Sequence, residues 1–392
     1  MIPFLPSVLG GQFLRITSMN FFFFASVNAF VLLPLYIQQL GGSEAGIGLI
    51  MGMYNAAGIF CQPLVGAWVD RIGRRPFLLL GVSLVAAASI GFNVFGALPV
   101  FAALRAFQGV GFSAFFVSNY TMVVDLVPPE RRGWALGIFG ISGLLSTALS
   151  PLAGEFVIRH LGFPAFFAMT TLFALAALAL TVGVRESGGA MAVRLRGVQV
   201  IREGLGDVLR LHMALAFFFG LGTGTIFTFL PTFGELLGVT SLALFYTAYA
   251  LAAMLVRAVG GGLSDTLGRR AVIVPSMFVQ AIATGILAAL GILIAPQATI
   301  PVLPFLFLAG LLAGGAHGFL YPALAALLMD ETAEERRGSV VGIFSSVFLA
   351  GNAFGSMVFG YVIHGFGYGT MWSVLTGLLT AGFLASFRLR AG

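Results

Sequence analysis

The sequence contains no lysine, one cysteine and very few charges for its size. Only 9% of its 392 residues are charged, whereas 59% are hydrophobic and the mean hydropathy is +1.03. A soluble domain has about a quarter charged residues, so these charges cannot cover a soluble surface. That excludes a cytosolic enzyme and a nucleic-acid-binding domain, despite the net charge of +6. The single Cys61 excludes a disulfide framework and a thiolate metal cluster. The remaining class is a polytopic membrane protein.

Long apolar runs fill most of the chain. A bilayer core about 30 Å thick needs about 20 apolar residues in a helix. Continuous runs of this length favour helices, because the strands of a membrane barrel are short and alternate in hydrophobicity. The sequence therefore predicts an all-α membrane protein with twelve transmembrane helices, near residues 12–40, 44–69, 77–97, 99–125, 134–160, 164–184, 208–235, 240–263, 271–294, 300–328, 339–364 and 369–388.

The basic residues predict the orientation. All 20 are arginines, and most lie in alternate junctions between the apolar runs, in the middle connection and in the tail. Positively charged loops stay in the cytoplasm. We therefore expect a multi-pass protein of the bacterial cytoplasmic (inner) membrane with both termini in the cytoplasm.

The two halves of the chain resemble each other. Residues 66–75 (GAWVDRIGRR) align with 261–270 (GGLSDTLGRR) at an offset of 195, and 125–139 align with 330–344 at an offset of 205. Six helices thus recur in the same orientation, as in transporters built from parallel repeats. We expect a six-helix bundle over 1–184, a cytoplasmic linker over 185–207 and a second six-helix bundle over 208–392.

The segment GAWVDRIGRR resembles the signature loop between helices 2 and 3 of the major facilitator superfamily. Its fixed positions are all present, and a degenerate copy carries three matching charged residues: Gly66, Asp70, Arg71, Gly73, Arg74 and Arg75, then Asp265, Arg269 and Arg270. The resemblance implies a twelve-helix secondary transporter in which this loop is a cytoplasmic gate. The residues themselves suggest that Asp70 accepts hydrogen bonds from a helix N-terminus and that the arginines bridge to Asp125. The alternative is a basic loop that only sets topology.

Few ionisable side chains lie well inside the predicted spans. Arg105 and Gln108 resemble a motif of the family's fourth helix, and Glu155 lies at a similar depth in the next helix. We predict an Arg105–Glu155 pair, either static or broken by proton or substrate binding. His317, near the middle of its helix, is a further candidate proton carrier, although a buried packing role is the alternative. Arg257 is expected to extend to the cytoplasmic interface or to bond to loop carbonyls, and not to contact the substrate.

Uncharged polar residues in the spans are candidates for lining a substrate cavity. Helix 5 also resembles, imperfectly, the antiporter motif of the family, which favours export. The cavity candidates are Asn28, Asn55, Gln108, Tyr249, Tyr321 and Asn352.

Together these features predict a proton-coupled secondary transporter that moves a small molecule by alternating access, most simply efflux by antiport. Proton-coupled uptake by symport and a polytopic membrane enzyme are the alternatives. The chain is loosely similar to sugar-efflux and metallophore-exporting branches of the family. No phosphate-binding loop of the ATPase type is present. We expect no enzyme activity, cofactor, metal or nucleic acid, and a monomer whose partners are its substrate, protons and the lipid bilayer.

Overall fold

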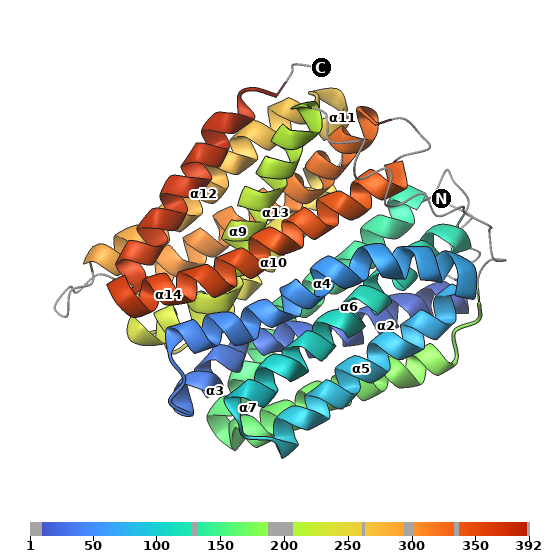
Figure 1. Ribbon diagram of the computed structural model, residues 1–392, viewed down its shortest axis with the longest axis horizontal. Helices are drawn as coiled ribbons and strands as arrows, with labels where there is room; N and C mark the ends of the chain where they lie inside the picture. The colour runs from blue at the N-terminus through green and yellow to red at the C-terminus, as the bar shows by residue number, and fades with distance from the viewer. Residues whose placement is uncertain are drawn as a thin grey trace, which may run out of the picture. The chain divides into compact units, whose positions relative to one another are not determined.

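The computed structural model describes residues 10–127, 132–186, 207–260, 263–293, 301–332 and 337–389, and these form helices and connecting turns (Figure 1). In the first half the helices are α2 (Gly11–Ala29), the 3-10 turn η1 (Phe30–Leu32), α3 (Leu33–Gln39), α4 (Glu44–Ile72), α5 (Arg74–Val94), α6 (Leu98–Leu126) and α7 (Arg132–Val182). In the second half they are α9 (Asp207–Leu236), α10 (Ala243–Gly260), α11 (Leu263–Thr266), α12 (Arg269–Leu293), α13 (Val302–Asp330) and α14 (Arg337–Ser386).

Two helices are too long to cross a membrane once. α7 has 51 residues and α14 has 50, which at 1.5 Å per residue is about 75 Å. Each breaks at a glycine with positive φ, at Gly162 (80°) and at Gly367 (78°), a conformation that only glycine adopts readily. Divided there, with α2, η1 and α3 taken as one span and the four-residue α11 set aside, the described helices correspond one for one to the twelve predicted spans.

The contacts divide the chain into two compact units that differ slightly from the two halves of the sequence. One unit contains 1–30 and 60–195, and the other contains 31–59 and 196–392. The segment 31–59 joins the second unit because α3 packs on α9 and the start of α4 packs on α14. At Gly48, a Cβ atom would lie 2.3 Å from the backbone oxygen of Ser356. The predicted division at 184 and 208 therefore describes the sequence repeat, and most of the predicted linker lies outside the described residues.

In the first unit, α2 and α7 are held together by side-chain amides. Asn20 donates a hydrogen bond to the Ser142 hydroxyl (2.8 Å), and Asn28 donates to Ser146 (3.0 Å) and Thr147 (2.9 Å). Such bonds between membrane helices contribute about 0.6 kcal/mol each on average. They fix the register of the two helices along much of α2.

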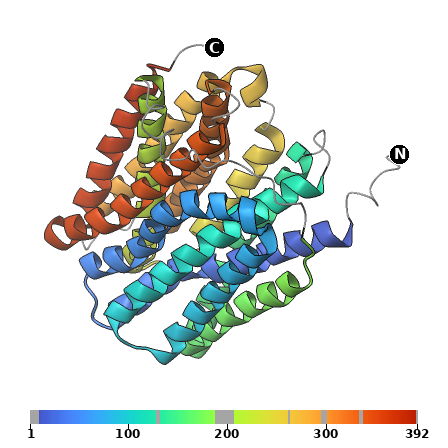
Figure 2. The same ribbon diagram turned by 45° about the vertical axis from the view of Figure 1, so that its right-hand side comes forward.

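In the second unit, the corresponding pair of helices, α9 and α14, packs through glycines instead. A Cβ atom at Gly220 would lie 2.1 Å from the backbone oxygen of Phe348, and one at Gly224 would lie 2.4 Å from that of Asn352. Both views show α9 (yellow-green) running beside the red C-terminal part of α14 (Figures 1 and 2). Small residues allow the backbones to approach closely, which is how membrane helices gain packing energy.

A second glycine stripe joins α13 to α10. Gly310, Gly314 and Gly318 face, in order, the backbone of Phe245, Tyr249 and Ala253. The constant spacing of 65 residues shows that the two helices run parallel in one register. Continued by one turn, this register brings Arg257 beside Pro322 and Tyr321.

We predict that Gly314→Ala destabilises the protein and that Gly315→Ala does not. A Cβ atom at Gly314 would lie 2.0 Å from the Tyr249 backbone oxygen, whereas one at Gly315 meets no described atom within 4 Å. Overpacking of this kind costs about 1–3 kcal/mol. Thermal unfolding of the two purified variants measures the difference, and equal midpoints would contradict the register.

Candidate functional site

The turn between α4 and α5 places the signature arginines in the first unit. Gly73, with a φ of 109°, allows the sharp turn that ends α4 and begins α5. The buried Arg74 places its Nε atom 3.1 Å from the Oδ2 atom of Asp125, at the end of α6. Arg75 donates from Nη2 to the backbone oxygen of Val182, at the end of α7 (3.1 Å). The arginines thus connect the start of α5 to the ends of two other helices.

The carboxylate at the N-terminus of α5 belongs to Glu186, a residue that the sequence analysis missed. Its two oxygens accept hydrogen bonds from the backbone N–H groups of Arg74 and Arg75, both at 2.9 Å. An anion is favoured there because the helix dipole and the free N–H groups both point at it. Sequence spacing did not suggest this contact, because Glu186 follows Gly73 by more than 110 residues.

The second copy of the loop repeats these contacts in the second unit. Arg269 places Nε 3.0 Å from Oδ2 of Asp330, and Arg270 donates to the backbone oxygen of Phe387 (3.1 Å). Asp330 is the counterpart of Asp125, and Phe387 is the counterpart of Val182, both at the offset of 205. The degenerate copy therefore keeps the same pair of contacts, which the sequence motif alone did not show.

Four other loop residues are placed without a contact or have no described side chain. The side chains of Asp70 and Asp265 lie outside the described residues. Arg71 is exposed. A Cβ atom at Gly66 would meet no described atom within 4 Å.

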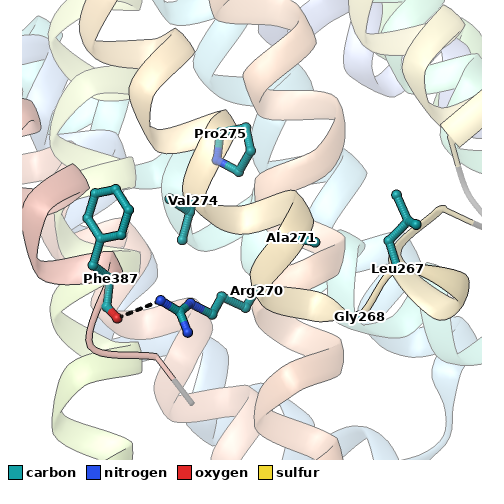
Figure 3. A pocket seen from close by; sticks show the side chains of 7 residues that line it. All are labelled: Leu267, Gly268, Arg270, Ala271, Val274, Pro275 and Phe387. Carbon is teal, nitrogen blue, oxygen red and sulfur yellow. Dashed lines mark hydrogen bonds between the residues drawn. The ribbon is translucent and has the colours of Figure 1, made fainter. Parts of the chain in front are cut away.

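A pocket of about 400 Å³ lies beside the second copy of the loop (Figure 3). Its walls are mostly apolar, and the Arg270 side chain, which reaches across to Phe387, is its one charged group. Gly268 and Arg270 correspond to Gly73 and Arg75, where Glu186 binds in the first unit. The residue 205 positions after Glu186 is an alanine, so the second copy has no equivalent carboxylate.

Arg105 is buried in the first unit, with 5% of its surface exposed. It donates to the Oε1 atom of Gln108 (2.8 Å), and its guanidinium carbon lies 5.7 Å from the centre of the Phe30 ring, a cation–π distance. Glu155 accepts a hydrogen bond from Arg159, one turn along α7 (2.7 Å). The Arg105–Glu155 pair remains a prediction.

His317 lies in the second unit at the centre of α13, between aromatic rings of two neighbouring helices. Its ring centre is 5.2 Å from that of Phe219 on α9 and 5.5 Å from that of Tyr249 on α10. Its Nδ1 atom is buried and has no hydrogen-bond partner among the described residues. The predicted candidates His317 and Tyr249 are therefore brought together.

Arg257 lies near the end of α10, two turns after Tyr249, and its Nε atom is buried. The register of α10 on α13 brings it beside Tyr321, one turn after His317 on α13. Side chains on a helix lean toward its N-terminus, which near the end of α10 is the direction of His317 and Tyr249. The extension of Arg257 to the cytoplasmic interface remains a prediction.

The remaining cavity candidates have separate positions. Asn28 binds α7, as described above. Asn55 is partly buried on α4. The Tyr321 hydroxyl lies 3.1 Å from that of Ser345 on α14. Asn352 is buried against α9 and donates to the backbone oxygen of Phe348 (2.9 Å), so it contributes to packing of α9 on α14.

We predict that Glu186→Gln loosens the start of α5 without affecting the rest of the unit. The neutral amide loses the charge-assisted part of both N–H contacts, and loss of a helix cap costs about 0.5–2 kcal/mol. Hydrogen exchange of the amides at 74–78 measures this change. Glu235→Gln, at an exposed acid, is the matched control. Unchanged exchange in Glu186→Gln would contradict the capping role.

Comparison with known proteins gives relatives over nearly the whole chain. Multidrug resistance protein MdtG of Salmonella choleraesuis (strain SC-B67) is 24% identical over 364 residues, covering 88% of this chain and 87% of the relative. MdtG of Salmonella typhimurium is similar to the same extent, at 24% identity over 364 residues.

Solved transporter structures share the fold at low identity. A mutant of the nucleoside transporter NupG superposes with a TM-score of 0.82 at 14% identity, covering 96% of this chain and 99% of that one. The D-xylose-proton symporter has a TM-score of 0.77 at 18% identity, with 96% of each chain covered. The human organic anion transporter MFSD10 (TETRAN) has a TM-score of 0.68 at 19% identity, with coverage of 95% and 99%.

The sequence profile of the Major Facilitator Superfamily matches residues 16–293 and 213–391. Together with the apolar helices, the two copies of the gate loop and the shared fold, this match covers most of the chain. The protein therefore belongs to the Major Facilitator Superfamily and is an integral, multi-pass membrane transporter.

Proposed function

We propose that this transporter exports a small organic molecule in exchange for protons. The observation that carries the proposal is the set of ionisable side chains inside the spans, at Arg105, Glu155, Arg257 and His317. Such residues are costly in a membrane and mark substrate or proton pathways by default. In a transporter without an ATP-binding loop, an ion gradient supplies the free energy.

Export is favoured by the names of the relatives and by a sequence motif in the first part of α7. The relatives that cover most of the chain are described as multidrug resistance proteins, a name that fits efflux. The segment Ser150–Glu155 keeps the proline and one glycine of the antiporter motif that it resembles. Both features support antiport.

Symport is the second candidate. The shared fold with the D-xylose-proton symporter shows that this architecture also serves proton-coupled uptake. The direction of substrate movement in response to an imposed pH gradient distinguishes the two mechanisms.

The arginine clusters place the protein, in this proposal, in the cytoplasmic membrane of a bacterium with both termini inside. It would act as a monomer, with its substrate, protons and lipid as partners. The loop contacts Arg74–Asp125 and Arg269–Asp330 would hold the cytoplasmic ends of each bundle during the transport cycle.

We predict that Asp70→Asn strongly reduces transport, by at least about tenfold, while insertion into the membrane is normal. Tenfold corresponds to about 1.4 kcal/mol in a barrier, within the range of one charge-assisted hydrogen bond. Flux in proteoliposomes at matched protein content measures the effect, with Glu235→Gln as the control acid. A normal rate would show that the loop only sets topology.

We predict that proton coupling depends on Glu155 or His317. Glu155→Gln and His317→Ala each remove a proton-binding group, so at least one should abolish most of the flux that depends on a pH gradient. His317 is faced by Arg257 and Tyr249 and by the uncharged Phe219, so substitution there removes the titratable imidazole of this cluster.

The measurement is substrate flux against an imposed pH gradient for wild type and both variants, with the exposed His160→Ala as control. If gradient-dependent flux is retained in both variants, neither Glu155 nor His317 is the proton-coupling residue. Wild-type flux that does not depend on the pH gradient would reject proton coupling.

A further inference from the structure

Arg257 is a charge without a carboxylate partner in the part of the chain that the structure describes. The ion pairs of the described arginines in the second unit include Arg269 with Asp330, whereas none involves Arg257. Its Nε atom is buried and forms no hydrogen bond to a described residue. A membrane-embedded guanidinium is stable only when something neutralises or solvates it.

The surrounding groups can complete a binding site for a negative charge. The buried His317 Nδ1 atom is likewise without a hydrogen-bond partner among the described residues, and the His317 ring lies 5.5 Å from that of Tyr249, two turns before Arg257 on α10. Guanidinium, phenol and imidazole can all donate hydrogen bonds to one anion. Arginine also matches the planar geometry of carboxylate and phosphoryl groups.

The position of the cluster is fixed by the backbone. Gly314 brings α13 against α10 at Tyr249, and Gly318 does so at Ala253, one turn before Arg257. A larger side chain at Gly314 or Gly318 would push α13 away from α10. The cluster is therefore held by rigid helices, not by a loop.

The matching positions in the other half of the chain carry no charge. In that half Val65 and Val69 of α4 share one buried apolar cluster with Phe77 of α5 and Ala114 of α6. At the repeat offsets, Arg257 corresponds to Gln62 and His317 corresponds to Phe112. A charge needed only for packing would be expected in both halves.

Aromatic rings surround the cluster. Tyr249 lies 5.2 Å from Phe227, and His317 lies 5.2 Å from Phe219, measured between ring centres. These apolar walls suit the organic part of a molecule whose charged group lies at Arg257.

We propose that Arg257, flanked by Tyr249 and His317, binds the negatively charged group of the transported molecule, and that the substrates are small organic anions with a carboxylate or phosphoryl group. This inference deepens the proposed transport function and rests on it.

Thermal unfolding of the purified full-length protein, with no gradient present, tests the site. Three probes share a naphthyl body and differ in charge: 2-naphthoate is an anion, 2-naphthamide is neutral and 2-naphthylmethylammonium is a cation. Phenylphosphonate is a second anion, with a phosphoryl group. We expect the anions to raise the unfolding midpoint of wild type by at least about 2 °C, as ligands of the native state do. The neutral and cationic probes should not.

Arg257→Gln should abolish this shift. Arg257→Lys keeps the positive charge but lacks the paired N–H donors of the planar guanidinium, so it should retain part of the shift. Arg388→Gln is the matched control, because Arg388 is an exposed arginine just after the end of α14. If Arg257→Gln does not fold, Tyr249→Phe and His317→Gln remove the flanking donors and should each weaken anion protection several-fold.

The absence of an anion-specific shift in wild type, or an equal shift in Arg257→Gln, overturns the anion site. The result is separable from the transport proposal. Anion binding without gradient-dependent flux in proteoliposomes rejects proton coupling and keeps the site. Gradient-dependent flux of the cationic probe without anion binding rejects the site and keeps transport.

Discussion

Close contact between helix backbones at glycine positions is the constraint on which the second unit depends. Lipid offers no hydrophobic driving force between helices, so membrane helices associate through van der Waals packing and hydrogen bonds. Gly220 and Gly224 bring α9 against α14, while Gly310, Gly314 and Gly318 bring α13 against α10. These contacts leave no room for a side chain, and they set the register that places His317 beside Tyr249 and Arg257 beside Tyr321.

The two halves use the same architecture with different chemistry. Both have the positive-φ turn, the arginine–aspartate pair and the arginine that holds the end of the last helix of its half. These shared contacts belong to the scaffold, because each half needs to join the same three helix ends. The unshared groups include Glu186 at the start of α5, Arg105 beside Phe30, and the cluster of Arg257 and His317.

This difference separates structural from functional residues without any alignment of relatives. A charged residue that occurs at the same position in both halves makes a contact that both halves need for their fold. A charge in a span that occurs in one half only is costly, and packing does not account for it. By this criterion Arg257 and His317 are the strongest candidates for contact with a substrate in the second unit.

The sequence by itself determined the fold class, the spans and the repeat. Runs of about 20 apolar residues can only be membrane helices, and the loop motif with its second copy indicated the family that the profile match then showed. It also predicted the contact between Arg74 and Asp125, because both lie at loop ends on the same side of the membrane. These are properties of hydropathy and of charge position, which one-dimensional spacing records.

Only the tertiary structure decided which side chains meet. Glu186 contacts the start of α5 although the two are more than 110 residues apart in the sequence, and the register of α13 on α10 brings Arg257 beside Tyr321, one turn from His317. Asn352, a cavity candidate by composition, is buried where α14 crosses the glycines of α9. Such contacts depend on the register of neighbouring helices, which close packing of backbones sets and hydropathy does not encode.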